Sequence, residues 1–306
     1  MKIIFYNQFH NGDCFVSKSY VRDIIQTIKA KRNDIEFEYA HNNHPQLLLD
    51  VPATYRPVNS LPVDRMLRIG RMGDDIVVNT WVGCWQGEIF GFGEHINFKR
   101  LHEIWRRYYA AIAKLVDVEL PFGDDPQIYV PYIDDNFYRT DLIRNYMQGY
   151  AKKRKILICN GPANSGQSQM GNFIAEIDVL SQEYPDIQFI ATERTKIRRL
   201  NVSHTHDIFA FDVEGKCDLN EIALLSRHCD LIVGKNSGPY SFAHHRVNMF
   251  DGNKTFLCFS TQATSCLNAE QRWPAKFLFT DKVSHPDALS VLRYTIDQVL
   301  TKPQAL

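Results

Sequence analysis

The feature that most constrains the fold of this chain is a regular alternation between short apolar runs and longer amphipathic segments. The apolar runs are rich in Ile, Val, Leu and Phe, which is typical of strands buried on both faces of a parallel sheet. In the segments between them, apolar residues recur at helical spacing, as Leu101, Ile104 and Trp105 do. Strands that alternate with helices in this way predict the α/β class.

The predicted elements fall into two series along the chain. Apolar runs predict strands at residues 3–6, 35–40, 75–81, 127–132, 155–159, 188–192, 207–211, 231–233, 254–259 and 277–279. Helical periodicity predicts helices at residues 16–28, 98–116, 137–150, 173–180, 219–227 and 288–300. The basic run at 152–155 lies between the two series and marks a boundary.

Two series of elements imply two domains, because 306 residues exceed the length over which a single core usually grows. We expect residues 1–150 to form an N-terminal domain and residues 151–306 to form a C-terminal domain. Each is predicted to be a doubly wound, Rossmann-like α/β domain, and the strand ends of both are expected to face a shared cleft. The closing helix at 288–300 could pack back on the N-terminal domain.

Composition and charge exclude several classes of protein. The 35 basic and 35 acidic residues balance, so no overall field attracts nucleic acid. No stretch approaches the roughly 18 apolar residues that a membrane span requires. The seven cysteines are scattered without Cys-x-x-Cys spacing, which predicts reduced thiols in a cytoplasmic protein and neither a disulfide framework nor a metal site.

Two polar turns follow predicted strands of the second series. The turn after strand 231–233 precedes a helix-compatible segment and consists of Lys235, Asn236, Ser237, Gly238 and Pro239. The turn after strand 155–159 contains Asn160, Gly161, Asn164 and Ser165, and it matches neither a P-loop nor a Gly-x-Gly-x-x-Gly pattern. Backbone N–H groups and a helix N-terminus favour anions at such turns, so the pair would suit a diphosphate. The alternative is that each turn is an ordinary strand-to-helix connection.

Two loops of the first series are candidates for substrate contact. Asn11, Gly12 and Asp13 follow the first strand, at the sheet edge where open α/β folds bind ligands. Asp13 is interpreted either as a helix N-cap or as a carboxylate presented to substrate. The loop after strand 75–81 interleaves glycines with aromatic residues and includes Trp85 and Gln86, which suits sugar rings. The alternative for that loop is a packed Ω-loop.

These motifs resemble those of glycosyltransferases with the GT-B fold, and most nearly the bacterial lipopolysaccharide heptosyltransferases. In that family a Gly-Asp pair follows the first strand, as Gly12-Asp13 does here. The family's late signature is Asp-Thr-Gly-x-x-His-x-Ala, and the aligned segment of this chain is 236–243. Asn236 stands in place of the acidic residue of that signature, and Ser241 stands in place of the histidine.

The resemblance implies a glycosyltransferase that moves a hexose or heptose from a nucleotide-diphosphate sugar to a glycan or other hydroxyl acceptor, in cell-surface glycan biosynthesis. Asp13 would be the general base of an inverting reaction. No Asp-x-Asp metal motif lies in a suitable loop, so we expect catalysis without a metal or other cofactor. The N-terminal domain would bind acceptor through Asn11, Gly12, Trp85 and Gln86. The C-terminal domain would bind donor through Asn160, Gly161, Asn164, Ser165, Glu214, Lys235, Asn236, Ser237, Gly238 and Pro239, with Glu214 at the ribose.

Two other functions remain open on the sequence. A sugar-nucleotide epimerase on the same scaffold would need no separate acceptor. A noncatalytic binding or partner protein would keep the fold without the chemistry, and the substitutions at Asn236 and Ser241 are compatible with it.

Overall fold

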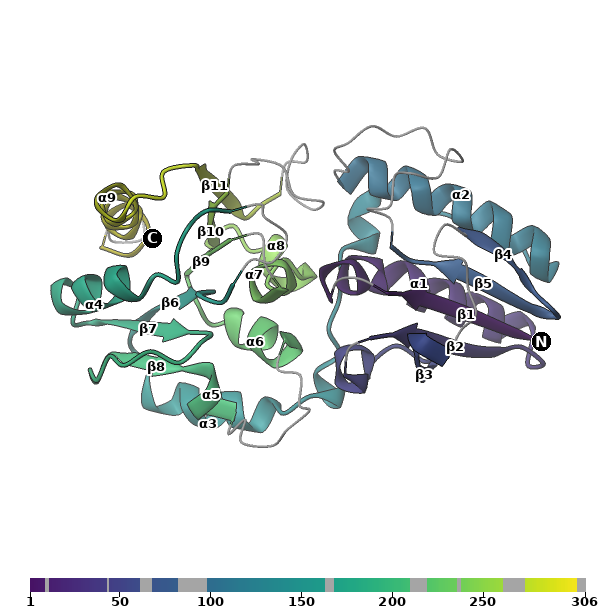
Figure 1. Cartoon of the computed structure of the whole chain (residues 1–306), viewed down its shortest axis with the longest axis horizontal. Coiled ribbons are helices and arrows are strands. Elements are labelled where there is room, and N and C mark those ends of the chain that lie inside the picture. The colour runs from purple at the N-terminus through teal and green to yellow at the C-terminus, as the bar shows by residue number, and fades with distance from the viewer. Residues whose placement is uncertain are drawn as a thin grey trace. The chain divides into compact units, whose positions relative to one another are not determined.

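A computed structural model describes residues 1–8, 11–42, 44–60, 68–81, 98–162, 168–209, 219–235, 238–260 and 273–301. The chain divides into two compact units, and the division falls between Tyr132 and Ile133. We call residues 1–132 unit 1 and the described residues from 133 to 301 unit 2. Figure 1 labels the helices and strands of each.

Unit 1 contains a sheet in which the described strands follow the order β3-β2-β1-β5-β4. β1 pairs in parallel with β2 and β5, β3 extends the sheet in parallel, and β4 is antiparallel to β5. The strands are β1 (Lys2–Asn7), β2 (Glu36–His41), β3 (Thr54–Pro57), β4 (Ile69–Met72) and β5 (Asp75–Asn79). The helices are α1 (Asn11–Lys31), α2 (Phe98–Val116) and the 3-10 turns η1 (Pro45–Leu48), η2 (Val58–Ser60) and η3 (Pro126–Tyr129).

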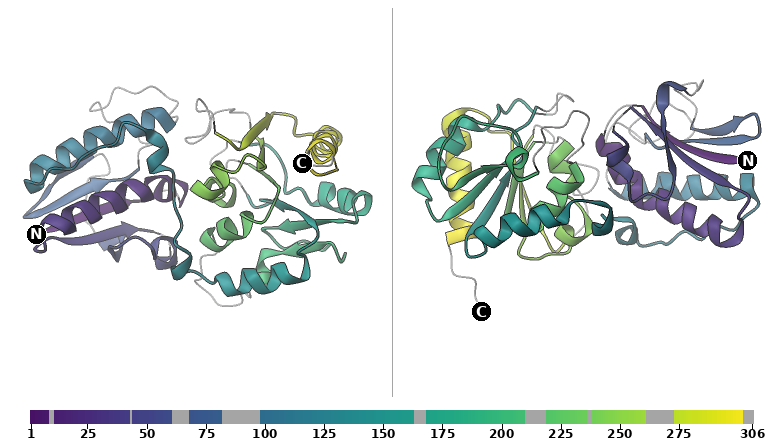
Figure 2. Two further views of the ribbon diagram at one scale, coloured as in Figure 1. Left: turned by 180° about the vertical axis from the view of Figure 1, so that it is seen from behind. Right: turned by 90° about the horizontal axis from the view of Figure 1, so that it is seen from below.

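The two long helices of unit 1 pack against each other through aromatic side chains. Tyr20 of α1 stacks on Trp105 of α2, with ring centroids 4.9 Å apart and planes within 2°. Tyr20 also stacks on Tyr129 of η3 at 4.4 Å. The aromatic stripe of α2 is therefore core, and Figure 2 shows α1 and α2 on the same side of the sheet.

Unit 2 contains a sheet in which the described strands follow the order β11-β10-β9-β6-β7-β8, and every pairing in it is parallel. The strands are β6 (Arg154–Ile158), β7 (Ile187–Ala191), β8 (Val202–His204), β9 (Leu231–Gly234), β10 (Thr255–Phe259) and β11 (Lys276–Thr280). The helices are η4 (Asp135–Phe137), α3 (Thr140–Gly149), α4 (Ile174–Glu183), α5 (Thr205–Phe209), α6 (Leu219–Ser226), α7 (Gly238–Phe242), α8 (Arg246–Met249), α9 (His285–Ile296) and η5 (Asp297–Thr301).

Helices α4 and α9 cover one face of the sheet in unit 2 (Figure 2). Ile177 and Leu180 of α4 join Leu292 and Ile296 of α9 in one apolar cluster with side chains of β6, β7, β9 and β10. This cluster is the core of unit 2. The closing helix therefore packs within the C-terminal part of the chain.

Each sheet has a topological switch point, where consecutive strands leave in opposite directions. In unit 1 the chain runs from β1 outward through β2 and β3, while β5 lies on the other side of β1. In unit 2 it runs from β6 outward through β7 and β8, while β9 to β11 lie on the other side of β6. In open α/β sheets, ligands bind outside the carboxyl ends of the strands at such points. The fold thus marks the loops after β1 and β5, and those after β6 and β9.

Two of the predicted strands are wrong. Residues 127–132 contain η3, because Asp125 accepts a hydrogen bond from the Gln127 amide at 2.9 Å and Pro126 starts the turn. The strand expected at residues 207–211 is also wrong, because residues 205–209 form α5. The strand of this region is β8, which ends at His204, immediately before α5 begins.

The division between the units comes earlier than the expected boundary at residue 150. The segment that follows Tyr132 is fastened to unit 2 by two arginines. Arg227 donates two hydrogen bonds to the carboxylate of Asp135, at 2.7 and 2.8 Å. Arg139 donates to Glu221 of α6 and to the carbonyl of Phe209, both at 3.1 Å. These contacts hold residues 133–150, including α3, in unit 2.

Two features are absent from the residues that the structure describes. Their helices are all too short or too polar to span a membrane. No three His, Cys, Asp or Glu side chains in the same residues are grouped so that they could hold a metal ion.

Candidate functional site

The two polar turns of unit 2 follow neighbouring strands at its switch point. β6 and β9 pair directly, with Ile158 opposite Val233, and the Cys159 amide continues the ladder by donating to the Val233 carbonyl at 2.8 Å. Asn160 and Gly161 therefore leave the sheet beside Lys235. Gly238 and Pro239 begin α7. Asn164, Ser165, Glu214, Asn236 and Ser237 lie outside the described residues.

Asn160 is buried, and its side chain binds the protein. Its Oδ1 accepts a hydrogen bond from the Glu193 amide at 2.7 Å, and its Nδ2 donates to the Glu193 carbonyl at 3.3 Å. Its Oδ1 also accepts from the Thr192 hydroxyl at 3.3 Å. The side chain of Asn160, a residue predicted to bind donor, thus ties the loop after β6 to the loop after β7.

Gly161 leaves space that the Glu193 side chain occupies. A Cβ atom at position 161 would lie 3.2 Å from Oε1 of Glu193, closer than an ordinary van der Waals contact. Glycine at this position therefore lets a carboxylate approach the loop after β6.

Gly234 lets α7 pack tightly against the end of β9. A Cβ atom there would lie 2.7 Å from Cδ2 of Tyr240 and 3.0 Å from Cβ of Cys159. At Gly238 the same addition would meet Leu219 only at 3.6 Å, an ordinary contact. The close approach at Gly234 brings the first turn of α7 to the switch point.

Lys235 places a buried ammonium group at this edge. Its Nζ donates to the carbonyls of Gly171 and Met170, at 3.0 and 3.4 Å. Burial lowers the pKa of this amine. Among the described residues, none supplies a carboxylate partner within ion-pair distance. An ammonium group has three protons to donate, and only two of them have an acceptor among the described residues.

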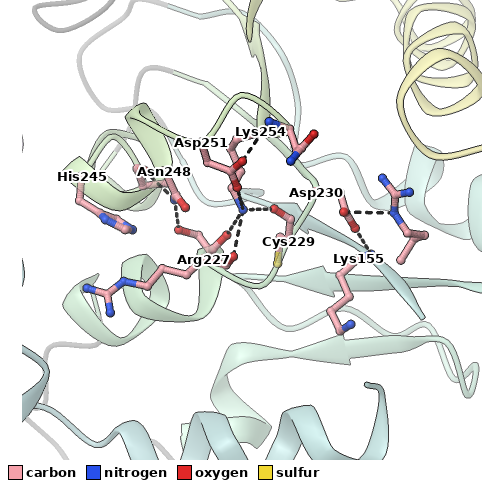
Figure 3. Close-up of polar contacts among 12 residues, drawn as sticks. Lys155, Arg227, Cys229, Asp230, His245, Asn248, Asp251 and Lys254 are labelled. Carbon is pink, nitrogen blue, oxygen red and sulfur yellow. Dashed lines mark hydrogen bonds and ion pairs between the residues drawn. The ribbon is translucent and has the colours of Figure 1, made fainter. Parts of the chain in front are cut away.

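A second buried lysine at the opposite edge of the sheet has a structural role. Lys254 precedes β10 and donates to the carbonyls of Cys229, Arg227 and Ser226, at 2.5, 3.0 and 3.2 Å (Figure 3). Ser226 is the last residue of α6 and the other two follow it, so the ammonium lies at the C-terminal end of the helix, where cations are favoured by the helix dipole. Asp251 lies 3.9 Å from the same ammonium.

In unit 1, Asn11, Gly12 and Asp13 form the first turn of α1. Asp13 is therefore not the N-cap, which removes that interpretation. Burial raises the pKa of the Asp13 carboxyl to about 7, and a hydrogen bond from its own backbone amide opposes the shift. A carboxyl with such a pKa exchanges protons near neutral pH, as a general base requires. Trp85 and Gln86 lie outside the described residues.

A network of hydroxyl groups joins this turn to the strand ends at the switch point of unit 1. Ser17 Oγ contacts the carbonyls of both Asp13 and Thr80, at 2.6 and 3.0 Å. The Thr80 hydroxyl bonds the Tyr39 hydroxyl at 2.7 Å and donates to the Tyr6 carbonyl at 3.1 Å. We did not predict Ser17, Tyr39 or Thr80. Thr80 was placed inside a strand, although it follows β5 at the ligand-binding edge.

Glu193 was also absent from the predicted site. The signal for it was present, because the sequence predicts a strand at 188–192 and Glu193 is the residue that follows. By the same rule that selected Asn160 and Lys235, an acidic residue at that position is a candidate for ligand contact.

Comparison with known proteins adds information on the fold. No protein-family model matches the sequence, and no curated protein matches it. Among solved structures, the chain is similar to the E. coli heptosyltransferase WaaC with ADP-2-deoxy-2-fluoro heptose, with 9% identity, 97% of this chain and 100% of that chain covered, and a TM-score of 0.50. It is also similar to E. coli ADP-heptose lipopolysaccharide heptosyltransferase II (10% identity, 97% and 99% covered, TM-score 0.46). A candidate UDP-N-acetylglucosamine 2-epimerase from Listeria monocytogenes has 9% identity, 97% and 88% coverage and a TM-score of 0.49.

At 9% identity, the similarity to WaaC concerns the fold. The chain is an α/β protein with the fold of GT-B glycosyltransferases, which agrees with the resemblance that the motifs indicate.

Proposed function

We propose that this protein is a glycosyltransferase that moves a sugar from a nucleotide-diphosphate sugar to a hydroxyl acceptor. The observation that carries the proposal is the position of the two polar turns of unit 2. They follow β6 and β9, the two strands that flank the switch point of a parallel sheet, where a nucleotide ligand is expected. The fold shared with GT-B enzymes supports the same assignment.

In this proposal unit 2 holds the donor. The ammonium of Lys235 and the backbone amides at the start of α7 surround the diphosphate. As the bond between the sugar C1 and the diphosphate breaks, negative charge grows on the leaving oxygen, and these groups stabilise it. The chemistry requires no metal from the protein, and the nucleoside diphosphate is the leaving group.

Unit 1 supplies the base and contacts the acceptor, with Asn11 and Gly12 beside Asp13 and with Trp85 and Gln86 from the loop after β5. The Asp13 carboxylate takes the proton of the acceptor hydroxyl while that oxygen attacks C1 from the face opposite the diphosphate. The product is inverted at C1. A carboxyl with a pKa of about 7 is suited to this step, because it is a stronger base than an ordinary aspartate and is still largely ionised slightly above neutral pH.

We extend the proposal to a cytoplasmic location. Cys14, Cys159, Cys229 and Cys258 are free and buried, which supports a reducing compartment. If the acceptor is a cell-surface glycan or its precursor, the protein has a role in cell-surface glycan synthesis.

The first test is a thermal-shift screen with nucleoside diphosphates and their sugars. A ligand at a hundred times its Kd should stabilise the fold by about 2.7 kcal/mol. If no member of the panel stabilises the fold, the proposal is refuted. Donors that bind are then incubated with and without saccharide acceptors, in the presence of a chelator, and nucleoside diphosphate release is followed by phosphorus NMR.

The same assay separates the other two functions. Acceptor-dependent release in chelator supports a metal-independent transferase. Isomerisation of the sugar on the nucleotide without an acceptor identifies an epimerase. Tight donor binding with no turnover against any acceptor identifies a noncatalytic binding protein.

A further inference from the structure

Asp13 lies in the first turn of α1, which is the part of a helix that the helix itself holds least firmly. α1 begins at Asn11, so Asp13 is its third residue. The first four N–H groups of a helix have no partner within the helix, and helix ends open locally at little cost in free energy. A base at this point keeps a fixed place only if other parts of the fold hold the turn.

Ser17 connects this turn to the segment that follows β5. It lies one helical turn after Asp13, and its Oγ is 2.6 Å from the Asp13 carbonyl and 3.0 Å from the Thr80 carbonyl. The side chain of Ser17 is fully buried, and its single hydroxyl hydrogen can be donated to either carbonyl. The hydroxyl therefore bridges the backbone of the first turn of α1 and the backbone at the ligand-binding edge of the sheet.

Thr80, which accepts from Ser17, is itself fixed by three hydrogen bonds. Its backbone N–H and its hydroxyl both donate to the Tyr6 carbonyl of β1, at 2.9 and 3.1 Å. Its hydroxyl also bonds the Tyr39 hydroxyl of β2 at 2.7 Å. Thr80 is fully buried, as are Tyr6 and Tyr39. Through this one residue, the end of β5 is joined to β1, to β2 and to α1.

Burial separates the base from the groups that hold it. Asp13 is partly exposed, so an acceptor can reach its carboxylate. Ser17 and Thr80 have no exposed surface, so an acceptor cannot contact either of them. Any effect of these two residues on the reaction is therefore exerted through Asp13.

We propose that Ser17 and Thr80 are positioning residues, which hold the first turn of α1 against the segment after β5 and so fix the place of the Asp13 carboxylate. This inference rests on the proposed function. Its physical basis is the sensitivity of proton transfer to geometry, since a displacement of about 1 Å costs on the order of 10²-fold in rate.

The direct test is Ser17→Ala. The wild-type chain is given ADP-, GDP- and UDP-linked sugars with a panel of saccharide acceptors, and the pair that it turns over is used for every variant. We expect kcat to fall by about 10- to 100-fold, because the turn that carries Asp13 loses its link to Thr80. The affinity for the nucleoside diphosphate, measured by calorimetry, should be unchanged, because unit 2 holds the donor.

Ser181→Ala is the matched control. Ser181 is a buried serine of α4 in unit 2, and its Oγ donates to the Asp178 carbonyl of the same helix at 3.2 Å. The change removes a buried hydroxyl of the same kind away from Asp13, so kcat should equal that of the wild type. Chemical denaturation shows that each variant is folded under the assay conditions.

Two substitutions of Thr80 separate its hydroxyl from its shape. Thr80→Val keeps the shape of the side chain and removes the hydroxyl that bonds Tyr6 and Tyr39. Thr80→Ser keeps the hydroxyl and removes the methyl group. We expect Thr80→Val to lower kcat and Thr80→Ser to restore most of it, with the nucleoside diphosphate affinity of both unchanged.

A double-mutant cycle shows whether Ser17 acts through Asp13. Two changes that disable the same catalytic group are not additive. Asp13→Asn already removes the base, so the double variant Asp13→Asn, Ser17→Ala should be little slower than Asp13→Asn alone. A serine with a general structural role would slow both backgrounds by the same factor.

The results that would overturn the inference differ in what else they overturn. If the wild type transfers sugar and Ser17→Ala keeps its kcat, or if Ser181→Ala loses as much, the link does not position the base. The same conclusion follows if the losses at Ser17 and Asp13 multiply, and the proposed function stands in each of these cases. If the wild type transfers sugar from none of the donors, both the inference and the proposed function fail.

Discussion

The side chain of Asn160 forms hydrogen bonds with both backbone polar groups of Glu193. It accepts from the N–H at 2.7 Å and donates to the C=O at 3.3 Å. We predict that Asn160→Ala lowers the free energy of unfolding by about 1–3 kcal/mol, because both partners lose a hydrogen bond inside the protein. Chemical denaturation measures the change. The control is Asn172→Ala, which removes an exposed acceptor of the Ile174 amide and should cost less than about 1 kcal/mol. If the two variants lose the same free energy of unfolding, the buried contacts of Asn160 stabilise the fold no more than one exposed hydrogen bond does.

The activity of Asp13 can be tested separately from donor binding. We predict that Asp13→Asn lowers kcat by about 10²–10⁴-fold and leaves nucleoside diphosphate affinity unchanged, because an amide cannot accept the acceptor proton. In the wild type, kcat should rise with pH through about 7, where the carboxyl ionises. Asp23→Asn is the control on the same helix, since Asp23 accepts a hydrogen bond from Tyr109. A variant at Asp13 with wild-type kcat would exclude this residue as the base.

The same carboxyl should make stability depend on pH. Its pKa is about 7 in the folded chain and close to 3.9 in an unfolded one, so between these values the folded state binds more protons. The wild type therefore loses stability as pH rises from about 4 to 7. Asp13→Asn lacks this loss and should gain stability relative to the wild type over that interval. Chemical denaturation of both chains at pH 5 and at pH 8 gives the stability of Asp13→Asn relative to the wild type at each pH. If this relative stability is the same at the two pH values, the carboxyl is not desolvated in the folded chain.

The sheets could be predicted because their strands are buried on both faces. Ile156 and Val233 lie in continuous apolar runs, and such runs indicate parallel strands without any knowledge of their neighbours. The strand expected at 127–132 shows the limit of this rule. Ile128 and Val130 alternate with other residues as in a strand, but the capping side chain of Asp125 and the ring of Pro126 turn the chain into η3.

The candidate site could be predicted only in part, for a related reason. Asp13 and Lys235 stand out because of their residue types and because each follows an apolar run. Thr80 does not, since its contact with Tyr39 depends on β1 lying between β2 and β5. The order of strands in a sheet is set by packing across distant segments, and no local pattern in this sequence specifies it.

The two buried lysines of unit 2 provide a test of the proposed diphosphate site. We predict that Lys235→Met weakens nucleoside diphosphate binding by about 10-fold or more, because a charged donor is lost. It also leaves the carbonyls of Gly171 and Met170 without their donor, so it should lower stability by about 1–3 kcal/mol as well. Lys254→Met leaves the three carbonyls around the end of α6 without their donor and should lower stability by a similar amount, but with affinity unchanged. Titration calorimetry measures the affinity of both variants for nucleoside diphosphate, and denaturation measures their stability. If Lys235→Met binds as tightly as the wild type, Lys235 is not part of the diphosphate site.

The close packing of α7 on β9 makes a prediction about two glycines. Gly234→Ala places a Cβ atom 2.7 Å from Tyr240 and 3.0 Å from Cβ of Cys159, and both neighbours are buried, so neither can move without displacing the core. Such overpacking typically costs about 1–3 kcal/mol. Because the strain falls on the start of α7, nucleoside diphosphate affinity should fall as well.

Gly238→Ala is the matched control, because its new Cβ atom would only make ordinary contact with Leu219 at 3.6 Å. It should leave stability within about 0.5 kcal/mol of the wild type. If the two alanine variants were equally stable, the tight approach of Tyr240 to β9 would not be a property of the folded chain. In that case the position of α7 at the switch point would lose its physical basis.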